Sequence, residues 1–260
     1  MKILLLSLMA ILPMSAQAQE PVRLYAAGSL RGALNEIAAS YTDAKVEAVY
    51  GASGLLRDRI AGGERADIFA SANMEHPHSL AIKGQAGPVK RFARNRLCAL
   101  ASPKAGLATD NLLERMLDPA VALGTSTPKA DPSGDYAWQV FEKAERVRPG
   151  AFAVLAGKAR KLTGGPDSPP PPRDRNVYGM LVTEGKADVF LTYCTNAAEA
   201  KRENASLQVV ELPQDLAVGA DYGLALLSRS EPAYYFSQFI LSPTGQAILM
   251  KYGFSPGEAK

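Results

Sequence analysis

Residues 22–34 read VRLYAAGSLRGAL, an apolar strand pattern that passes through a glycine and Ser29 into an amphipathic helical pattern. The same order then continues, with strand patterns at 46–50 and 67–70 on either side of a helical pattern at 55–62. Hydrophobic strands that alternate with helices indicate βαβ units, in which parallel strands are covered by helices on both faces. This part of the chain therefore predicts an α/β fold.

A second series of alternating patterns follows and predicts a second α/β unit. Its strand patterns lie at 96–101, 121–124, 188–193 and 207–212, and its helical patterns at 136–146, 177–184 and 197–203. The chain ends with a strand pattern at 222–227, helical patterns at 232–241 and 243–252, and Gly253 as a helix stop. Residues 164–172, GGPDSPPPP, predict a stiff surface loop because proline lacks the N–H donor that a helix or central strand requires.

The composition is that of a globular protein with a sizeable core, since 47% of the 260 residues are hydrophobic and 21% are charged. Lys plus Arg number 29 against 26 Asp plus Glu, which leaves a net charge of +3 without a charged block. This balance does not favour a nucleic-acid partner. The length allows one large domain or two lobes of about 100 to 150 residues each.

The first 18 residues have the order of a secretory signal peptide. Lys2 precedes an apolar run at 3–14, and Ala16-Gln17-Ala18 supplies the small residues of a cleavage site. We expect cleavage after Ala18 and a soluble protein free in the periplasm. No later segment is as long and uncharged, so no membrane-spanning helix is expected. Neither cysteine lies near the cleavage site, so no lipid anchor is expected either.

The two cysteines, Cys98 and Cys194, both lie in strand-like apolar stretches. In an oxidising compartment such as the periplasm, two cysteines favour one disulfide bridge. The alternative is a pair of buried thiols, because free cysteine packs well as a small apolar side chain. We expect the bridge.

Motifs of the common enzyme classes do not occur in this chain. The phosphate-binding, dinucleotide-binding, zinc-protease and hydrolase nucleophile motifs are all missing, and Ser126-Thr127-Pro128-Lys129 lacks the other motifs of serine β-lactamases. The two histidines, His76 and His78, flank a proline and are interpreted as a solvated turn, not a metal site. They offer no convincing general base for a serine nucleophile. We expect neither an enzyme nor a cofactor or cation site.

Three serines lie where a strand pattern passes into a helical one: Ser29, Ser53 and Ser133. Each hydroxyl could simply cap its own helix. However, the carboxyl ends of parallel strands meet at one sheet edge, where open α/β sheets bind ligands. Helix N-termini present unpaired N–H groups and the positive end of the helix dipole, which suit an oxyanion. The pattern therefore favours a site for a small anion between two lobes.

Four motifs together resemble the periplasmic molybdate-binding components of ABC transporters. They are YAAGSL at 25–30, YGASGLL at 50–56, ADIFASA at 66–72 and KYGF at 251–254. The resemblance implies a type II periplasmic binding fold, in which two α/β lobes with mostly parallel sheets are joined by two crossovers. The implied division is a signal peptide at 1–18, an N-terminal lobe at 19–94 plus 217–260, a C-terminal lobe at 95–216, and crossovers near 92–95 and 212–218.

The resemblance also implies a set of ligand-binding residues. They are Ser29, Ser53, Ser133, Arg175 and Tyr193, with Asn176 as the alternative to Arg175. The family has an apolar residue that donates its N–H where this chain has Arg175, and an arginine there would add charge and two parallel donors for oxyanion oxygens. Alternatively only the Arg175 N–H is used, or the register shifts by one and Asn176 takes the place.

The implied function is that of a monomeric, non-enzymatic receptor that binds molybdate or tungstate and delivers it to a membrane permease. The anion would be held through the residues above, without a cation site or a cofactor. One alternative is a receptor for another tetrahedral oxyanion, such as sulfate or phosphate, or for a small organic acid admitted by the altered loop at Arg175. A secreted serine hydrolase is a further alternative from a different class.

Overall fold

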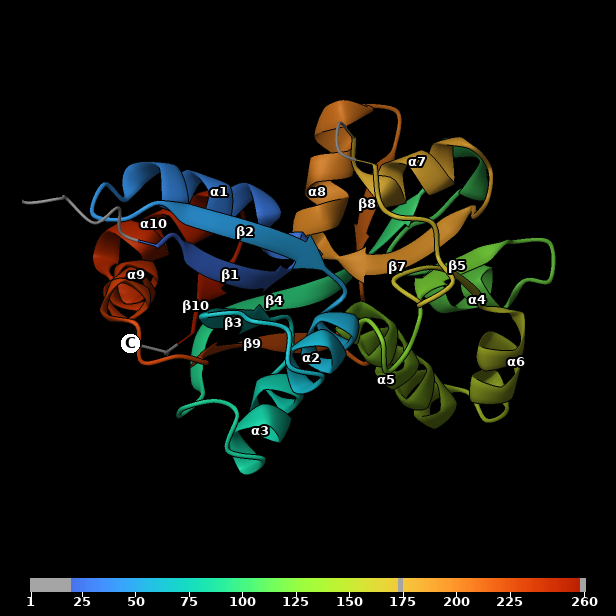
Figure 1. Ribbon diagram of the computed structural model, residues 1–260. Coiled ribbons are helices and arrows are strands. Elements are labelled where there is room, and N and C mark those ends of the chain that lie inside the picture. The colour runs from blue at the N-terminus through green and yellow to red at the C-terminus, as the bar shows by residue number, and fades with distance from the viewer. Residues whose placement is uncertain (1–19, 173–174, 258–260) are drawn as a thin grey trace, which may run out of the picture.

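The computed structural model describes residues 20–172 and 175–257. The predicted signal peptide at 1–18 therefore lies outside the described residues. Figure 1 shows the helices and strands gathered in two groups that lie side by side. Within the described ranges, no helix has the length and apolar content needed to cross a membrane.

The first group contains the βαβαβ arrangement that the opening stretch predicts. The strand at residues 22–27 lies in the middle and pairs in parallel with the strands at 46–51 and 68–71. All three strands therefore end at the same edge of the sheet. The elements are β1 (Val22–Ala27), a short 3-10 helix η1 (Gly28–Leu30), α1 (Arg31–Ser40), β2 (Val46–Gly51), α2 (Ser53–Ala61) and β3 (Ile68–Ser71). The sheet continues through β9 (Gly219–Leu226) and β4 (Lys90–Ala101), both antiparallel to their neighbours, in the order β2-β1-β3-β9-β4.

The second group is built around three parallel strands, of which β5 lies in the middle. These are β5 (Leu123–Ser126), β6 (Arg160–Thr163) and β7 (Val189–Tyr193). The helices are α4 (Leu112–Leu117), α5 (Pro132–Val147), α6 (Ala151–Lys158), α7 (Val177–Thr183) and α8 (Cys194–Glu203). Helix α5 has the apolar face of a helix that packs against a core. Its residues Ala137, Val140, Phe141 and Ala144 recur at helical spacing and are all buried.

Strand β4 belongs to both groups. Residues 90–96 pair with β9, whereas residues 98–101 pair with β7 and with β8 (Gln208–Glu211). Between these two stretches the Leu97 N–H donates to the Val218 carbonyl oxygen at 3.1 Å, on the segment that returns from β8 to β9. The chain thus passes between the groups at β4 and again before β9. The lobe boundaries given above stay a prediction.

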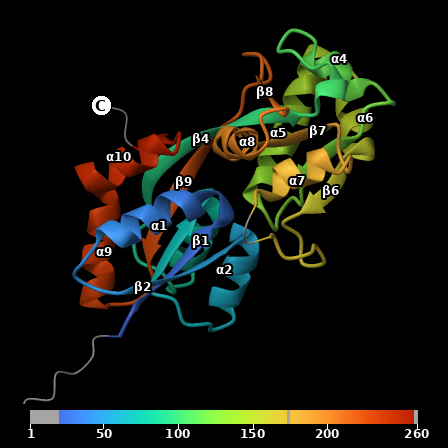
Figure 2. The same cartoon turned by 90° about the horizontal axis from the view of Figure 1, so that it is seen from above.

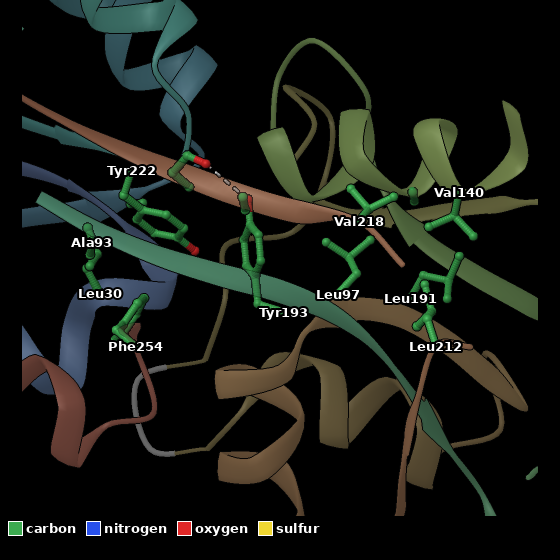
Figure 3. Packing of buried hydrophobic residues seen from close by; sticks show 14 of the residues in the cluster. Leu30, Ala93, Leu97, Val140, Leu191, Tyr193, Leu212, Val218, Tyr222 and Phe254 are labelled. Carbon is green, nitrogen blue, oxygen red and sulfur yellow. Dashed lines mark hydrogen bonds between the residues drawn. The ribbon is translucent and has the colours of Figure 1, made fainter. Parts of the chain in front are cut away.

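One hydrophobic core runs through this junction. Figure 3 shows Tyr193 and Tyr222 near its middle, and their ring centroids lie 5.6 Å apart. Leu97, Leu191 and Val140 continue the same cluster into the second group, and all are buried. Because one core spans both groups, the residues at the junction are held by packing from each side.

The solvated-turn interpretation of His76 is wrong. His76 lies in the first turn of α3 (Glu75–Ile82) and is 3% exposed, whereas His78 is exposed. Proline at position 77 does not prevent this helix, because the first N–H groups of a helix have no partner within it. Burial, together with the nearby Arg57, lowers the pKa of His76 to about 4. The ring is therefore a neutral part of the packing between α2 and α3.

The C-terminal elements close the first group. The predicted helices appear as α9 (Glu231–Leu241) and α10 (Pro243–Lys251), and a two-residue strand, β10 (Ser255–Pro256), then pairs with β4. Both helices begin with proline at the first or second position and a capping serine before it, which are strong helix-start signals. These signals explain why the sequence predicts both helices within one or two residues.

The predicted disulfide between Cys98 and Cys194 is confirmed. It joins β4 to the first residue of α8, directly after Tyr193. We expect that replacing both cysteines by alanine lowers the free energy of unfolding by about 2 to 4 kcal/mol, since the bridge closes a loop of roughly 100 residues in the unfolded chain. Urea denaturation of the parent and the double variant measures this difference. A loss below about 1 kcal/mol would contradict the prediction.

Candidate functional site

A cavity of about 490 Å³ lies between the two groups. On one side it is bounded by the carboxyl ends of β1, β2 and β3. On the other side it is bounded by Asp131, the loop after β6 and the starts of α7 and α8. Five of the six predicted site residues line it: Ser29, Ser53, Arg175, Asn176 and Tyr193. Predicted site residues that are far apart in the chain, from Ser29 to Tyr193, thus line the same cavity.

The interpretation that the serines cap their own helices is wrong. Neither η1, α1 nor α2 has a side-chain cap, and the residue before α2 is Ala52. At α5 the cap is Asp131, whose carboxylate accepts the Ser133 N–H. The hydroxyls of Ser29 and Ser53 are therefore not used by the helices that they precede or begin.

The Ser29 hydroxyl belongs to a short chain of hydrogen bonds. Asn95 Nδ2 donates to Thr195 Oγ1 at 2.9 Å and lies 3.3 Å from the Tyr222 hydroxyl, which is 3.0 Å from Ser29 Oγ. Since the Tyr222 oxygen accepts from an amide, its own proton can be donated to Ser29. That leaves the Ser29 proton to be donated into the cavity.

Ser53 and Tyr193 meet at Ala72, just after β3. The Ala72 N–H donates to Ser53 Oγ at 3.1 Å, and the Tyr193 hydroxyl donates to the Ala72 carbonyl oxygen at 3.4 Å. Ser53 Oγ thus accepts from the backbone and keeps its proton for another partner. Tyr193 comes from β7 in the second group, so its hydroxyl reaches across the cavity wall to the first group. Figure 3 shows its ring next to Tyr222.

The two groups also touch directly at the start of α2. The Gly54 N–H donates to the Ala130 carbonyl oxygen at 2.8 Å. A Cβ at Gly54 would lie 2.4 Å from the Lys129 carbonyl oxygen, which is too close for any side chain. Lys129 itself adopts a φ of 69°, an uncommon conformation for a residue with a side chain. A glycine at position 54 is therefore what allows this contact.

Ser133 does not line the cavity. Its N–H donates to Asp131 Oδ1 at 3.1 Å, and its hydroxyl is buried without a hydrogen-bond partner in the part of the chain that the structure describes. The predicted role of Ser133 in binding therefore has no counterpart in the lining of this cavity.

Arg175 and Asn176 lie at the start of α7. The Arg175 guanidinium is exposed and lies 3.7 Å from Glu184. Asn176 caps α7 through its Oδ1, and its N–H donates to Glu203 at 2.7 Å. In this structure the donors of Asn176 are thus engaged within the second group.

Four charged residues of the cavity were not among the predicted site residues: Arg31, Asp131, Glu199 and Glu203. The Arg31 guanidinium lies 4.6 Å above the Tyr50 ring, at the first turn of α1. Burial raises the pKa of Asp131 to about 6, although the hydrogen bond from Ser133 opposes this rise. A signal for Asp131 was present, because an Asp followed by a proline is a common start of a helix.

The proline-rich loop is a loop as predicted, but it is also a wall of the cavity. Residues 164–166 and 168–172 contribute to the lining opposite Ser53. In Figure 2 this loop, drawn in yellow between β6 and α7, lies beside α2. Proline offers no N–H donor and little polar surface, so this side of the cavity is mainly apolar. Ligand orientation must then come from the remaining walls.

The arrangement suits the binding of an anion. Hydroxyl donors and the N-terminal ends of α1, α2 and α8 face one cavity, and such groups stabilise oxyanions. Among the lining residues that the structure describes there is no histidine or lysine to act as a general base. The described ranges also hold no cluster of three or more His, Cys, Asp or Glu arranged for a metal ion.

Known proteins share this architecture. The chain is 35% identical over 239 residues to an uncharacterised protein of Pasteurella multocida, covering 90% of this chain and 98% of that one. The periplasmic molybdate-binding protein of Azotobacter vinelandii matches with a TM-score of 0.70 and 18% identity, over 90% of this chain and 98% of that one. The sulfate-binding protein SubI of Mycobacterium tuberculosis matches with a TM-score of 0.76 and 16% identity, over 92% and 87% of the two chains.

At these identities the structural matches show the fold alone, and they confirm the predicted type II periplasmic binding fold. The family comparison goes further, because it is based on sequence and covers nearly all of the described chain. Residues 22–255 match the bacterial extracellular solute-binding proteins. The chain therefore belongs to the family of bacterial extracellular solute-binding proteins.

Proposed function

We propose that this protein is the periplasmic receptor of an ABC importer, that it binds molybdate or tungstate in the 490 Å³ cavity, and that it delivers the anion to a membrane permease as a monomer. One observation carries the proposal. The hydroxyls of Ser29, Ser53 and Tyr193 line one cavity from both groups of elements, and none is used as a helix cap. Ser29 and Ser53 keep a proton for the ligand, and the Tyr193 proton, donated at 3.4 Å to the Ala72 carbonyl oxygen, would turn to a bound anion. A tetrahedral dianion accepts hydrogen bonds on all its oxygens and is therefore matched by convergent donors.

The neutral character of these donors is part of the argument. A charged side chain would bind many anions, whereas oriented hydroxyls and N–H groups select by size and geometry. Arg31 adds one positive charge at the edge, beside Tyr50. Arg175 also lines the cavity, but its guanidinium is exposed and lies near Glu184. Its predicted contribution to binding therefore rests only on its position in the lining.

The size of the cavity supports a second candidate. Sites for small organic ligands usually measure about 300 to 1,000 Å³, and 490 Å³ falls within that range. A small organic acid is therefore an alternative ligand, and sulfate or phosphate is another because the same hydroxyl donors would suit any tetrahedral oxyanion. A serine hydrolase is not proposed, because a serine nucleophile needs a base within hydrogen-bond reach, and the described lining offers only carboxylates.

We expect molybdate to raise the melting temperature by about 5 to 10 °C at a concentration of roughly 100 times its dissociation constant, because ligand binding to the native state adds about 2.7 kcal/mol. Sulfate at the same concentration should have a much smaller effect. Differential scanning calorimetry with molybdate, tungstate, sulfate, phosphate and a panel of small carboxylic acids measures these shifts. Equal shifts for molybdate and sulfate would contradict the molybdate assignment, and a larger shift with an organic acid would support the second candidate.

A further inference from the structure

Asp131 places a carboxyl group in the wall of the cavity that the hydroxyls of Ser29 and Ser53 also line. Its Oδ1 accepts the Ser133 N–H at 3.1 Å, which ties the side chain to the start of α5. Its other oxygen lies against Gly164, where a Cβ would stand only 2.5 Å from Oδ2. The carboxyl group is thus confined between α5 and the loop after β6, and it cannot turn away from the cavity on that side.

The groups that face Asp131 do not neutralise it. Asp135 on the same helix adds negative charge nearby. Tyr178 of α7 and Tyr193 of β7 are close and stay uncharged, because burial raises the pKa of both. Described charged residues of the lining besides Asp131 are Arg31, Arg175, Glu199 and Glu203. No described ion pair includes Asp131.

The two glutamates of the lining differ from Asp131. Glu199 and Glu203 are exposed, and each accepts a hydrogen bond from Asn176, at 3.1 and 2.7 Å. Solvent and these donors stabilise their charges. Asp131 is less accessible to water, and near its carboxyl group lie the Ser133 N–H, which donates at 3.1 Å, and the Ser126 hydroxyl. Of the three acids, Asp131 is therefore the one that a bound anion would perturb most.

A dianion beside an ionised carboxylate in a shielded cavity is strongly disfavoured by repulsion. Protonating the carboxyl group removes this repulsion and converts an acceptor into a donor. Burial already raises the pKa of Asp131 to about 6 in the free protein. The cost of adding a proton near neutral pH is therefore small compared with the repulsion that it relieves.

We propose that Asp131 takes up one proton when the cavity binds a dianion, and that the protonated carboxyl group donates a hydrogen bond to the ligand. The proton comes from solvent and forms an O–H bond on Oδ2, while Oδ1 keeps the Ser133 N–H. No other bond forms or breaks. This inference rests on the proposed function, because it assumes that an oxyanion occupies the cavity.

Proton uptake makes the affinity depend on pH in a defined direction. The pKa of Asp131 is about 6 in the free protein and must be higher in the complex. Affinity is then greatest below the lower value and falls as the pH rises from the lower to the higher value, by up to about tenfold per pH unit. Molybdate and sulfate both stay dianionic over this range, so the dependence would come from the protein.

Isothermal titration calorimetry with molybdate between about pH 6.5 and 8.5 tests this proposal on the full chain. Titration in two buffers of different ionisation enthalpy reports the number of protons taken up per molybdate bound. We expect this number to approach one. Asp131→Asn keeps an oxygen to cap α5 and an amide to donate, but it cannot ionise. We expect this variant to lose the pH dependence and, at about pH 8.5, to bind molybdate at least fivefold more tightly than the parent.

Glu142→Gln is the matched control, since Glu142 lies further along the same helix, is exposed and does not line the cavity. It should keep the pH dependence of the parent. Parent affinity that changes less than about twofold per pH unit, without proton uptake, would overturn the role of Asp131. So would an Asp131→Asn variant that keeps the slope of the parent. If no oxyanion binds at any pH, the proposed function itself is contradicted.

Discussion

Ser29→Ala and Ser53→Ala each weaken molybdate binding by about ten- to 150-fold, because a hydrogen bond from a hydroxyl to a charged ligand in a desolvated site is worth about 1.5 to 3 kcal/mol. The ligand-free protein should lose a few degrees in melting temperature, because each variant loses one hydrogen bond within the protein, to Tyr222 for Ser29 and to the Ala72 N–H for Ser53. Tyr193→Phe removes the hydroxyl but keeps the ring in the core, so it should weaken binding with still less effect on the fold. Dissociation constants and ligand-free melting curves measure both effects.

Ser40→Ala is a suitable control for these variants. Its hydroxyl is exposed and donates only to the Glu36 carbonyl oxygen within α1, so neither affinity nor melting temperature should change noticeably. Unchanged affinity in both the Ser29 and Ser53 variants would show that the anion binds elsewhere. The fold would stand in that case, but the set of binding residues would have to be abandoned.

Local patterns predicted much of the fold. The strands at β1, β2 and β3 and the helices between them appear within a few residues of their predicted bounds, because each pattern is set by contacts within one βαβ unit. The disulfide was predictable because it needs only two cysteines and an oxidising compartment. The start of α5 was placed too late, at residue 136, because the capping role of Asp131 and the first-turn place of Pro132 were overlooked.

The site was predicted only in part, and the reason is physical. Ser29 and Ser53 follow strands that end at one sheet edge, so pattern and resemblance could bring them together. Arg31, Asp131 and the proline-rich loop join the cavity because of how the two groups approach each other. That approach depends on contacts between residues far apart in the chain, such as Gly54 with Ala130. A local sequence pattern does not predict such contacts.

Gly54→Ala weakens molybdate binding by about ten- to 100-fold and also destabilises the ligand-free protein, by about 1 to 3 kcal/mol. The new Cβ would stand 2.4 Å from the Lys129 carbonyl oxygen and 2.6 Å from that of Ala130. Both are backbone atoms, so the two groups must move apart and the 2.8 Å hydrogen bond from Gly54 to Ala130 is lost. Ligand contacts made from both sides then cannot all form, at a cost of about 1.4 to 2.7 kcal/mol.

A second glycine separates this contact from the general effect of alanine in a helix. Alanine costs less chain entropy than glycine in a helical position, by about 0.4 to 1 kcal/mol, so without the clash the substitution would stabilise the protein. Gly157→Ala is the matched control, because Gly157 is also in a helix, α6, and a Cβ there meets nothing within 4 Å. It should raise stability slightly and leave the dissociation constant unchanged. A Gly54→Ala variant that binds molybdate as tightly as the parent would show that the contact at α2 does not contribute to closing the cavity around the ligand.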